Sequence, residues 1–262
     1  MVRGIEQFRA YFAGYERNYI IIGGTACDIL EENAGQQPRA TKDIDIILII
    51  EALTVDFIKR FWEFIKAGEY ETRQRGNGKH EYYRFLKPRS ADFPLQIEIS
   101  ARKPDVLDIS SDARFTPIPI GEDLSSLSAV LMNDVYYYYT MEHSTIESGI
   151  RFANVESLIV LKAKAYLDLS ERKTKGEVID SKKVNKHKND IFRLATMLAE
   201  NDNFVLHIEM QNDLDEFCQI VAQSLPDYAF FKAIGFPAKP EDVFSLLCRT
   251  FQVKPKINNT FH

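Results

Sequence analysis

Short runs of aliphatic residues, separated by polar turns, occupy much of the first hundred residues and predict several buried strands. Residues 18–22 form one such run, and residues 43–50 form another in which two carboxylates interrupt the apolar pattern. Side chains two positions apart on a strand point to the same face of a sheet. Asp43 and Asp45 are therefore expected on one face, while the isoleucines that alternate with them point into the core.

Other segments of the first half show helical spacing or strand alternation. Thr54 precedes an apolar helical stripe and is expected to be its N-cap. The Gly-Asn-Gly sequence at 76–78 is a strong hairpin signal. The tyrosine run at 136–139 is expected on a strand. The predicted elements are helices at 5–15, 26–33 and 54–66, hairpin strands at 70–75 and 81–86, and strands at 95–100 and 130–143.

The pattern changes to helical spacing after about residue 150. The predicted elements there are an apolar helix at 155–169, a lysine-rich connector at 170–188, and helices at 189–200, 214–224 and 240–251. We therefore expect an α+β fold class with two domains. Residues 1–150 would form a mixed sheet with helices, and residues 151–262 an all-α domain.

Composition narrows the class of protein without identifying it. The 262 residues include 45% hydrophobic residues and carry a net charge of −5, which favours a soluble protein and argues against coating by nucleic acid over its whole surface. The three cysteines, Cys27, Cys218 and Cys248, have neither disulfide-framework nor zinc-site spacing. No signal peptide is evident, and apolar runs are shorter than the ~20 residues of a membrane helix. We expect a cytoplasmic protein that does not enter a membrane.

The carboxylates on the predicted strands are the first candidate site. Glu98 lies on the polar side of the 95–100 strand, which is expected to neighbour the strand of Asp43 and Asp45. Magnesium prefers such hard oxygen ligands and is often held by a few carboxylates plus substrate phosphates. The alternative is structural: Asp43 would cap a loop, Asp45 would be a charge at the edge of the sheet, and Glu98 would be a solvated strand residue.

A glycine turn next to these carboxylates suggests a partner for the metal. Gly23 and Gly24 end the 18–22 strand and precede Thr25 and a short helix. Glycines let a backbone approach phosphate closely, and the first N–H groups of a helix favour an anion. The region is therefore predicted to hold magnesium and a nucleoside triphosphate side by side.

Two charged residues of the second half are further candidates. Lys162 lies in an apolar helix, where a lysine is costly to bury unless it meets an anion, such as a triphosphate. The alternative is a lysine that reaches the helix surface. Lys164 is expected to face elsewhere. Asp190 is expected at the beginning of a helix, where an aspartate is also an ordinary N-cap.

Basic and aromatic residues on the hairpin form another candidate surface. They could guide a nucleic acid by phosphate contacts and stacking, but a solvated edge hairpin is an equal explanation. The lysines of the 170–188 connector could also contact RNA, or they could belong to a solvated connector. The hairpin residues are Arg73, Arg75, Lys79, Tyr82, Tyr83 and Arg84.

The motif Ile22-Gly23-Gly24-Thr25, followed by Arg39-Ala40-Thr41-Lys42-Asp43-Ile44-Asp45, resembles the signature of the polymerase-beta-like nucleotidyltransferase superfamily. Its Arg-x-Thr-x-Asp-Ile-Asp form is most similar to the AbiEii family, the toxins of type IV toxin–antitoxin pairs. The segments around Glu98, Lys162 and Asp190 are similar to later motifs of that family. The loop from Glu31 to Pro38 is longer than the superfamily usually has.

The resemblance implies a magnesium-dependent nucleotidyltransferase. Its metal ligands would be Asp43, Asp45 and Glu98, which would hold two Mg²⁺ ions with the bound triphosphate. Nucleotide-binding residues would be Gly23, Gly24, Thr25 and Lys162, and the catalytic set would add Lys162 and Asp190 to the three acids. An acceptor hydroxyl on RNA or protein would attack the α-phosphate, and an antitoxin would be a protein partner. The alternative is a non-catalytic nucleotide- or RNA-binding module with the same fold.

Overall fold

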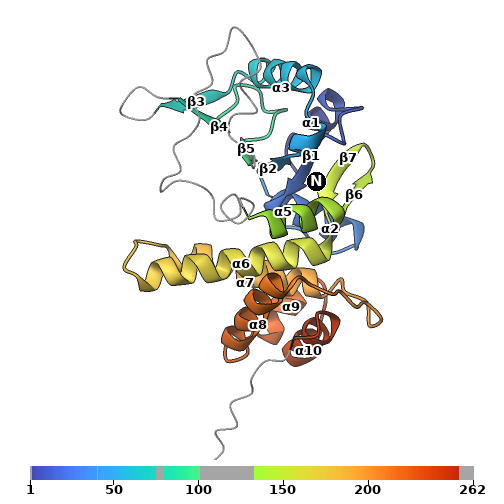
Figure 1. The fold of residues 1–262 in the computed structure, drawn as a ribbon, viewed down its shortest axis with the longest axis vertical. Helices are drawn as coiled ribbons and strands as arrows, with labels where there is room; N and C mark the ends of the chain where they lie inside the picture. The colour runs from blue at the N-terminus through green and yellow to red at the C-terminus, as the bar shows by residue number, and fades with distance from the viewer. Residues whose placement is uncertain (1, 40, 75–79, 101–132, 254–262) are drawn as a thin grey trace, which may run out of the picture. The chain divides into compact units, whose positions relative to one another are not determined.

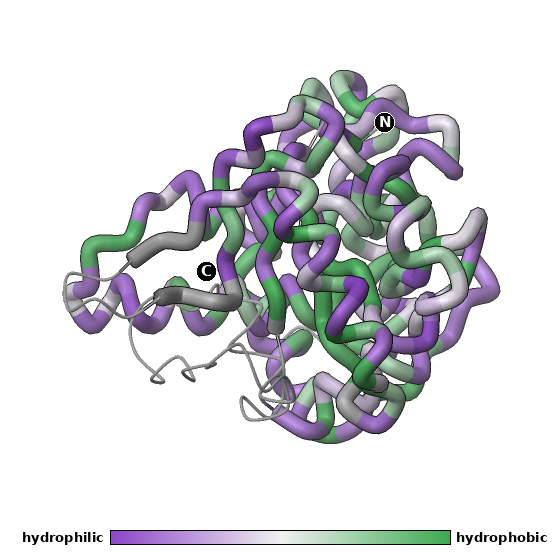
Figure 2. Tube along the Cα trace, turned by 90° about the horizontal axis from the view of Figure 1, so that it is seen from above, coloured by the Kyte–Doolittle hydropathy of each residue, from purple (hydrophilic) through white to green (hydrophobic). Residues whose placement is uncertain are grey.

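A computed structural model of the chain describes residues 2–39, 41–74, 80–100 and 133–253. The chain forms two compact units (Figure 1). Unit 1 comprises Met1–Glu32 and Pro38–Asn154, and unit 2 comprises Asn33–Gln37 and Val155–His262. Hydrophobic and hydrophilic residues are interspersed along the chain, as Figure 2 shows.

Unit 1 is built on a mixed sheet of seven strands among the described residues, in the order β3-β4-β5-β2-β1-β7-β6. Strand β2 lies antiparallel to β1 and parallel to β5, and β1 lies parallel to β7. The strands are β1 (Tyr19–Ile22), β2 (Asp43–Leu48), β3 (Glu71–Gln74), β4 (His80–Leu86), β5 (Gln96–Ser100), β6 (Ser144–Glu147) and β7 (Ile150–Ala153). With the helices below, this sheet confirms the α+β character predicted from the pattern.

The core of unit 1 is an aromatic cluster between the sheet and two helices, α1 (Ile5–Tyr11) and α3 (Val55–Ala67). The ring centroids of Phe8 and Phe64 are 5.8 Å apart, and those of Phe12 and Phe57 are 5.6 Å apart. The Thr54 hydroxyl accepts a hydrogen bond from the Phe57 N–H at 3.2 Å, so the predicted N-cap of α3 is confirmed. The aromatic cluster therefore packs α1 and α3 against one side of the sheet.

The predicted strand at 130–143 is wrong over its described residues, which begin at 133. The structure has a helix there, α5 (Asp134–Glu142), whose N-cap Asn133 accepts a hydrogen bond from the Val135 N–H at 2.8 Å. Tyrosines favour strands, but here the spacing of the buried residues Tyr136 and Thr140 is helical. Packing of one helix face therefore outweighs the intrinsic preference of the tyrosines.

A hairpin of β6 and β7 follows α5 and was not predicted. Ser148 and Gly149 have φ angles of 50° and 76°, and a two-residue hairpin turn of type I′ needs positive φ at both of its residues. The Ser-Gly pair was the available signal. Since Ile21 of β1 pairs with Phe152 of β7, the sheet of unit 1 extends past the expected boundary at residue 150.

The described residues of unit 2 form the helices α6 (Val155–Thr174), α7 (Ser181–Ala195), α8 (Ile208–Val221), α9 (Tyr228–Ala233) and α10 (Pro240–Thr250). The predicted connector at 170–188 is wrong, because α6 and α7 occupy most of it. Asp180 caps α7 by accepting the Lys182 N–H at 2.9 Å, and Val184 and His187 are buried on its apolar side. The charged run is thus the polar side of two helices.

Helix α2 (Gly23–Asn33) follows β1 without a loop, and a short 3₁₀ helix (Ile50–Ala52) follows β2. Across the part of the chain that the structure describes, none of the helices has the length and apolar character needed to span a bilayer.

Candidate functional site

Strand β1 runs directly into helix α2 at Gly23, and this junction lies against a carboxylate of β2. Gly23 has a φ of +68°, and a Cβ atom placed on it would lie 2.1 Å from Asp45 Oδ2. A Cβ atom on Gly24 would lie 2.8 Å from Thr41 Oγ1. Only glycine allows these approaches, because any larger residue would displace the Asp45 or Thr41 side chain. The two glycines therefore bring the N-terminus of α2 against the segment that leads into β2.

The carboxylates of β2 share one face, as the alternation predicted. Asp43 and Asp45 are half-buried, whereas Ile44 and Ile46 are buried at 0% and 1% exposure. Asp45 pairs with Ile22, the last residue of β1. The two carboxylates therefore lie on one side of β2, and Asp45 lies beside the end of β1, where the chain enters α2.

Glu98 lies beside Asp45 on the neighbouring strand. Strands β2 and β5 are parallel, and Asp45 and Glu98 are direct partners in their pairing. Direct partners point to the same side of a sheet, and Ile97 and Ile99 on either side of Glu98 are buried. The predicted neighbourhood of these two strands is confirmed, and it brings three acids to one side of the sheet.

The Glu98 side chain is held by a cation from strand β4. Arg84 Nε lies 2.8 Å from Glu98 Oε1, and Gln96 Nε2 donates to the same oxygen at 2.6 Å. Arg84 and Glu98 are also direct partners across the antiparallel β4–β5 pair. Arg84 thus faces the acids, where it offsets the repulsion of adjacent carboxylates.

Except for Arg84, the side chains of the predicted basic and aromatic surface on the hairpin are not among those that the structure describes. Arg75 and Lys79 lie outside the described residues, and so do the side chains of Arg73, Tyr82 and Tyr83. The pairing of β3 with β4 confirms the hairpin itself, with Glu71 opposite Leu86.

Helix α2 also fixes the backbone on both sides of Lys42. The Thr25 hydroxyl donates to the Asp43 carbonyl oxygen at 2.5 Å, and Asp28 Oδ2 accepts the Thr41 N–H at 2.5 Å. The Thr25 and Asp28 side chains are both 0% exposed. Thr25 was predicted to bind nucleotide, but its hydroxyl donates to the Asp43 carbonyl oxygen in the structure. Sequence reasoning missed Asp28, whose signal was a second polar residue one turn after Thr25 on the buried side of a short helix.

Two carboxylates of the predicted donor set offer ligands of the kind that magnesium prefers. Asp43 and Asp45 offer hard oxygen ligands on one face, and magnesium commonly takes one or two carboxylates together with substrate phosphates and water. Within the described ranges, no group of three or more His, Cys, Asp or Glu side chains is close enough to form a metal cage. Of the three predicted metal ligands, Asp43 and Asp45 therefore share one face of β2, while Glu98 contacts Arg84.

Lys162 and Asp190 form an ion pair inside unit 2. Lys162 Nζ lies 2.7 Å from Asp190 Oδ2, and the two side chains are 2% and 1% exposed. The anion that a lysine in an apolar helix was predicted to need is thus provided by α7. Asp190 lies well inside α7, so its predicted place at a helix N-terminus is wrong, and Asp180 is the N-cap. His187, one turn before Asp190 on the same helix, is also buried.

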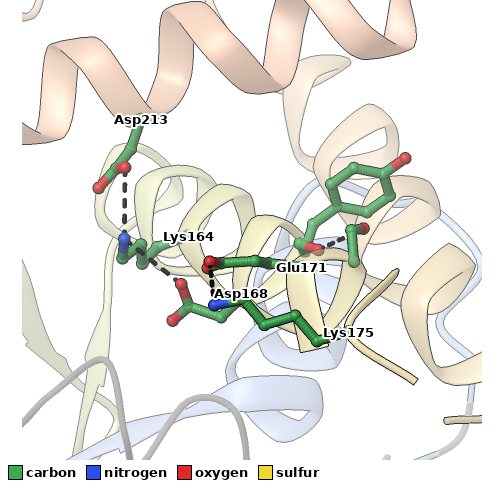
Figure 3. A network of polar contacts seen from close by, with 7 residues as sticks. Lys164, Asp168, Glu171, Lys175 and Asp213 are labelled. Atoms are coloured by element: carbon green, nitrogen blue, oxygen red, sulfur yellow. Dashed lines mark hydrogen bonds and ion pairs between the residues drawn. The ribbon is translucent and has the colours of Figure 1, made fainter. Parts of the chain in front are cut away.

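Lys164 faces α8 and a surface network, as Figure 3 shows. Its Nζ lies 3.3 Å from both Asp168 Oδ1 and Asp213 Oδ1. Burial lowers the pKa of Lys164, but the charges of Asp168 and Asp213 outweigh it and leave the pKa raised. Just past the end of α6, Lys175 Nζ lies 2.5 Å from Glu171 Oε1. Lys164 thus ties α6 to α8, and its different direction from Lys162 is confirmed.

Comparison of the chain with family models, with curated proteins and with solved structures gives no match.

Proposed function

We propose that the chain is a magnesium-dependent nucleotidyltransferase that moves a nucleoside monophosphate from a triphosphate to an acceptor hydroxyl on RNA or protein. The observation that carries the proposal is the position of Asp45. Its carboxylate lies against the glycine N-terminus of α2, with Asp43 on the same face and Glu98 beside it. A metal-binding face and an anion-binding helix end therefore adjoin each other.

The helix end is the proposed phosphate site. The first N–H groups of a helix have no partner within the helix, and the helix dipole favours an anion there. In α2 these groups belong to Gly23, Gly24 and Thr25. Because Gly23 and Gly24 have no side chains, phosphate oxygens can come close to these N–H groups.

The carboxylates are the proposed metal ligands. Asp43 and Asp45 would hold Mg²⁺ together with triphosphate oxygens. Bound there, the ion would neutralise charge on the attacking and leaving oxygens. A carboxylate of the site would accept the proton of the acceptor hydroxyl. Glu98 is the third acid that the resemblance implies, and its carboxylate is paired with Arg84 at 2.8 Å.

The resemblance to AbiEii toxins extends the proposal to a biological setting. In that setting the chain is the toxin of a toxin–antitoxin pair, and an antitoxin protein restrains it. We also propose that unit 2 is an all-α domain, since its described elements are helices. The roles of Lys162 and Asp190 in nucleotide transfer stay predictions from the resemblance, and the proposal for β2 does not depend on them.

Incorporation of labelled nucleotide tests the proposal. Each α-labelled nucleoside triphosphate is incubated with magnesium and either total RNA or a protein extract. We expect the wild type to label one of the two acceptors. Asp45→Asn is expected to lose at least about a hundredfold of this activity, because it removes a charge from the metal ligands.

The control variant is Asp56→Asn, which changes an exposed aspartate in the first turn of α3. It should label as well as the wild type. The mechanism is wrong if Asp45→Asn labels RNA or protein as well as Asp56→Asn does.

A non-catalytic nucleotide-binding module is the second candidate, and the Arg84–Glu98 ion pair favours it. Because Arg84 Nε lies 2.8 Å from Glu98 Oε1, Asp43 and Asp45 are the two acids of this sheet face that could bind a metal ion. Calorimetric titration with each triphosphate and magnesium separates the two functions. Binding that depends on Asp45, without transfer to either acceptor, identifies the module.

A further inference from the structure

The lysine-rich run of residues 170–188 has two parts that differ in how their charges are paired. At the end of α6, basic side chains contact acids of the same segment. Arg172 Nη2 lies 2.6 Å from Glu177 Oε2. The ammonium group of Lys175 contacts Glu171, as the dashed line between them in Figure 3 marks. These four charges therefore balance in pairs.

Helix α7 lacks such pairs on its exposed side. Lys182, Lys183 and Lys186 are exposed, and no carboxylate of the described residues forms an ion pair with their ammonium groups. The one acidic residue within α7, Asp190, is buried against Lys162. The exposed side of α7 thus carries uncompensated positive charge, in a chain whose net charge is −5.

The positive charge follows α7 as a stripe, here called the basic stripe. Side chains at positions i, i+4, i+7 and i+11 lie on one face of a helix. From its first to its last member the basic stripe is about 16 Å long. Asp180, the N-cap, lies at one end and accepts the N–H of residue 182. The members are Lys182, Lys186, Asn189 and Arg193, with Lys183 and Asn185 beside them.

At its other end the basic stripe has a guanidinium group that is held in place beside an aromatic ring. Arg193 Nη1 donates to the Gln37 carbonyl oxygen at 3.3 Å, and its guanidinium carbon lies 5.8 Å from the centre of the Phe230 ring. Phe230 belongs to α9 and is half-buried, so solvent reaches part of the ring. A nucleobase can stack on such a ring or on a guanidinium plane.

We propose that the basic stripe binds single-stranded RNA, with its cations on phosphates and Phe230 against a base. Lysine and arginine that neutralise phosphates release counterions, which favours binding. Asparagine amides both donate and accept, so they suit the ribose 2′-hydroxyl, which DNA lacks.

The composition of the basic stripe favours this partner over others. None of its members is apolar, whereas a membrane surface or an amphipathic partner helix would need an apolar face to bury. Every residue named for the site belongs to unit 2. The inference therefore concerns unit 2 alone and does not rest on nucleotide transfer.

Fluorescence anisotropy tests the proposal with the full chain and a fluorescein-labelled single-stranded RNA of about 12 nucleotides, without magnesium or triphosphate. Binding should weaken with salt, because each neutralised phosphate contributes about −0.7 to the slope of log K against log salt. The double variant Lys182→Gln with Lys186→Gln should bind at least about tenfold more weakly and reduce that slope by about 1.4.

The matched control is the double variant Lys59→Gln with Lys66→Gln. It removes two exposed lysines from α3 of unit 1 and changes the net charge by the same amount. Its affinity for RNA should stay within about twofold of the wild type, because local and not net charge decides the binding.

Photochemical cross-linking of the wild type to RNA that contains 4-thiouridine locates the contact without any variant. Mass spectrometry should identify cross-linked peptides from α7 or α9. DNA of the same sequence should bind at least about threefold more weakly than RNA, since it lacks the 2′-hydroxyl. Polyglutamate should not compete with RNA at equal concentration of charge.

The proposal is overturned if the α3 control loses as much affinity as the α7 variant, or if the cross-links lie only outside α7 and α9. Equal affinity for DNA, or competition by polyglutamate, overturns the assignment of the partner as RNA. Since magnesium and triphosphate are absent from these experiments, their outcome is independent of the nucleotide-transfer assay, and either proposal can fail alone.

Discussion

Gly23 is the residue at which a side chain would disturb the proposed site most directly. Its φ of +68° is unfavourable for any other residue, and a Cβ atom there would lie 2.1 Å from Asp45 Oδ2. Backbone strain and a clash with a proposed metal ligand therefore meet at one position. A matched substitution can separate the two effects, because Gly14 has a φ of +86° and nothing within 4 Å of its Cβ position.

We expect Gly23→Ala to lower the free energy of unfolding by about 1–3 kcal/mol more than Gly14→Ala, since both add strain but only Gly23→Ala displaces Asp45. Urea denaturation measures this difference. Gly23→Ala should also abolish nucleotide transfer, whereas Gly14→Ala should keep it. Equal loss of stability in both variants, with transfer retained, would show that the approach of Gly23 to Asp45 has no role.

At the residue scale, the sequence predicts which faces carry the acids but not what contacts them. Alternation alone places Asp43 and Asp45 on one face. The contact between Arg84 and Glu98 depends on how β4 and β5 align, and no local pattern encodes that alignment. The role of Asp28 depends in the same way on a backbone N–H thirteen residues further along the chain.

At the element scale, helices are harder to place than strands where local composition and packing disagree. The tyrosine-rich α5 has strand-forming residues and a helical pattern of burial. The lysine-rich run at 170–188 has few apolar residues, yet Val184 and His187 lie at helical spacing on a buried side. In both segments the buried residues, and not the overall composition, decide the structure.

The ion pair between α6 and α7 gives a prediction at this scale. Lys162→Met should lower the free energy of unfolding by about 3–5 kcal/mol, because it leaves the Asp190 carboxylate buried without its cation. Lys162→Met combined with Asp190→Leu should recover most of that loss, since both charges are then gone. Urea denaturation of the two single variants and the double variant forms a double-mutant cycle.

A Lys162→Met variant as stable as the wild type would contradict this account of the pair. Nucleotide transfer by the same variants gives separate information. If the double variant is stable but inactive, the pair has a role in transfer beyond holding α6 against α7.

At the scale of the whole molecule, the sequence predicts an α+β chain, but the strand order of its sheet lies beyond local patterns. Strand β1 lies between β2 and β7, and β7 comes from more than a hundred residues further along the chain. Such long-range pairing follows from packing and not from periodicity. Helical spacing is expected from about residue 150, whereas the longer stretch of unit 2 begins at Val155, because β7 belongs to the sheet of unit 1.

The central claim is that the β2 carboxylates and the N-terminus of α2 hold a divalent cation with a nucleoside triphosphate. A crystal structure with Mn²⁺ and a triphosphate analogue that cannot be cleaved at the α-phosphate tests it most directly. We expect anomalous density about 2.1 Å from carboxylate oxygens of Asp43 and Asp45, with phosphate oxygens at the N–H groups of Gly23 and Gly24. Metal and nucleotide bound elsewhere, with Asp43 and Asp45 contacting neither, would contradict the claim.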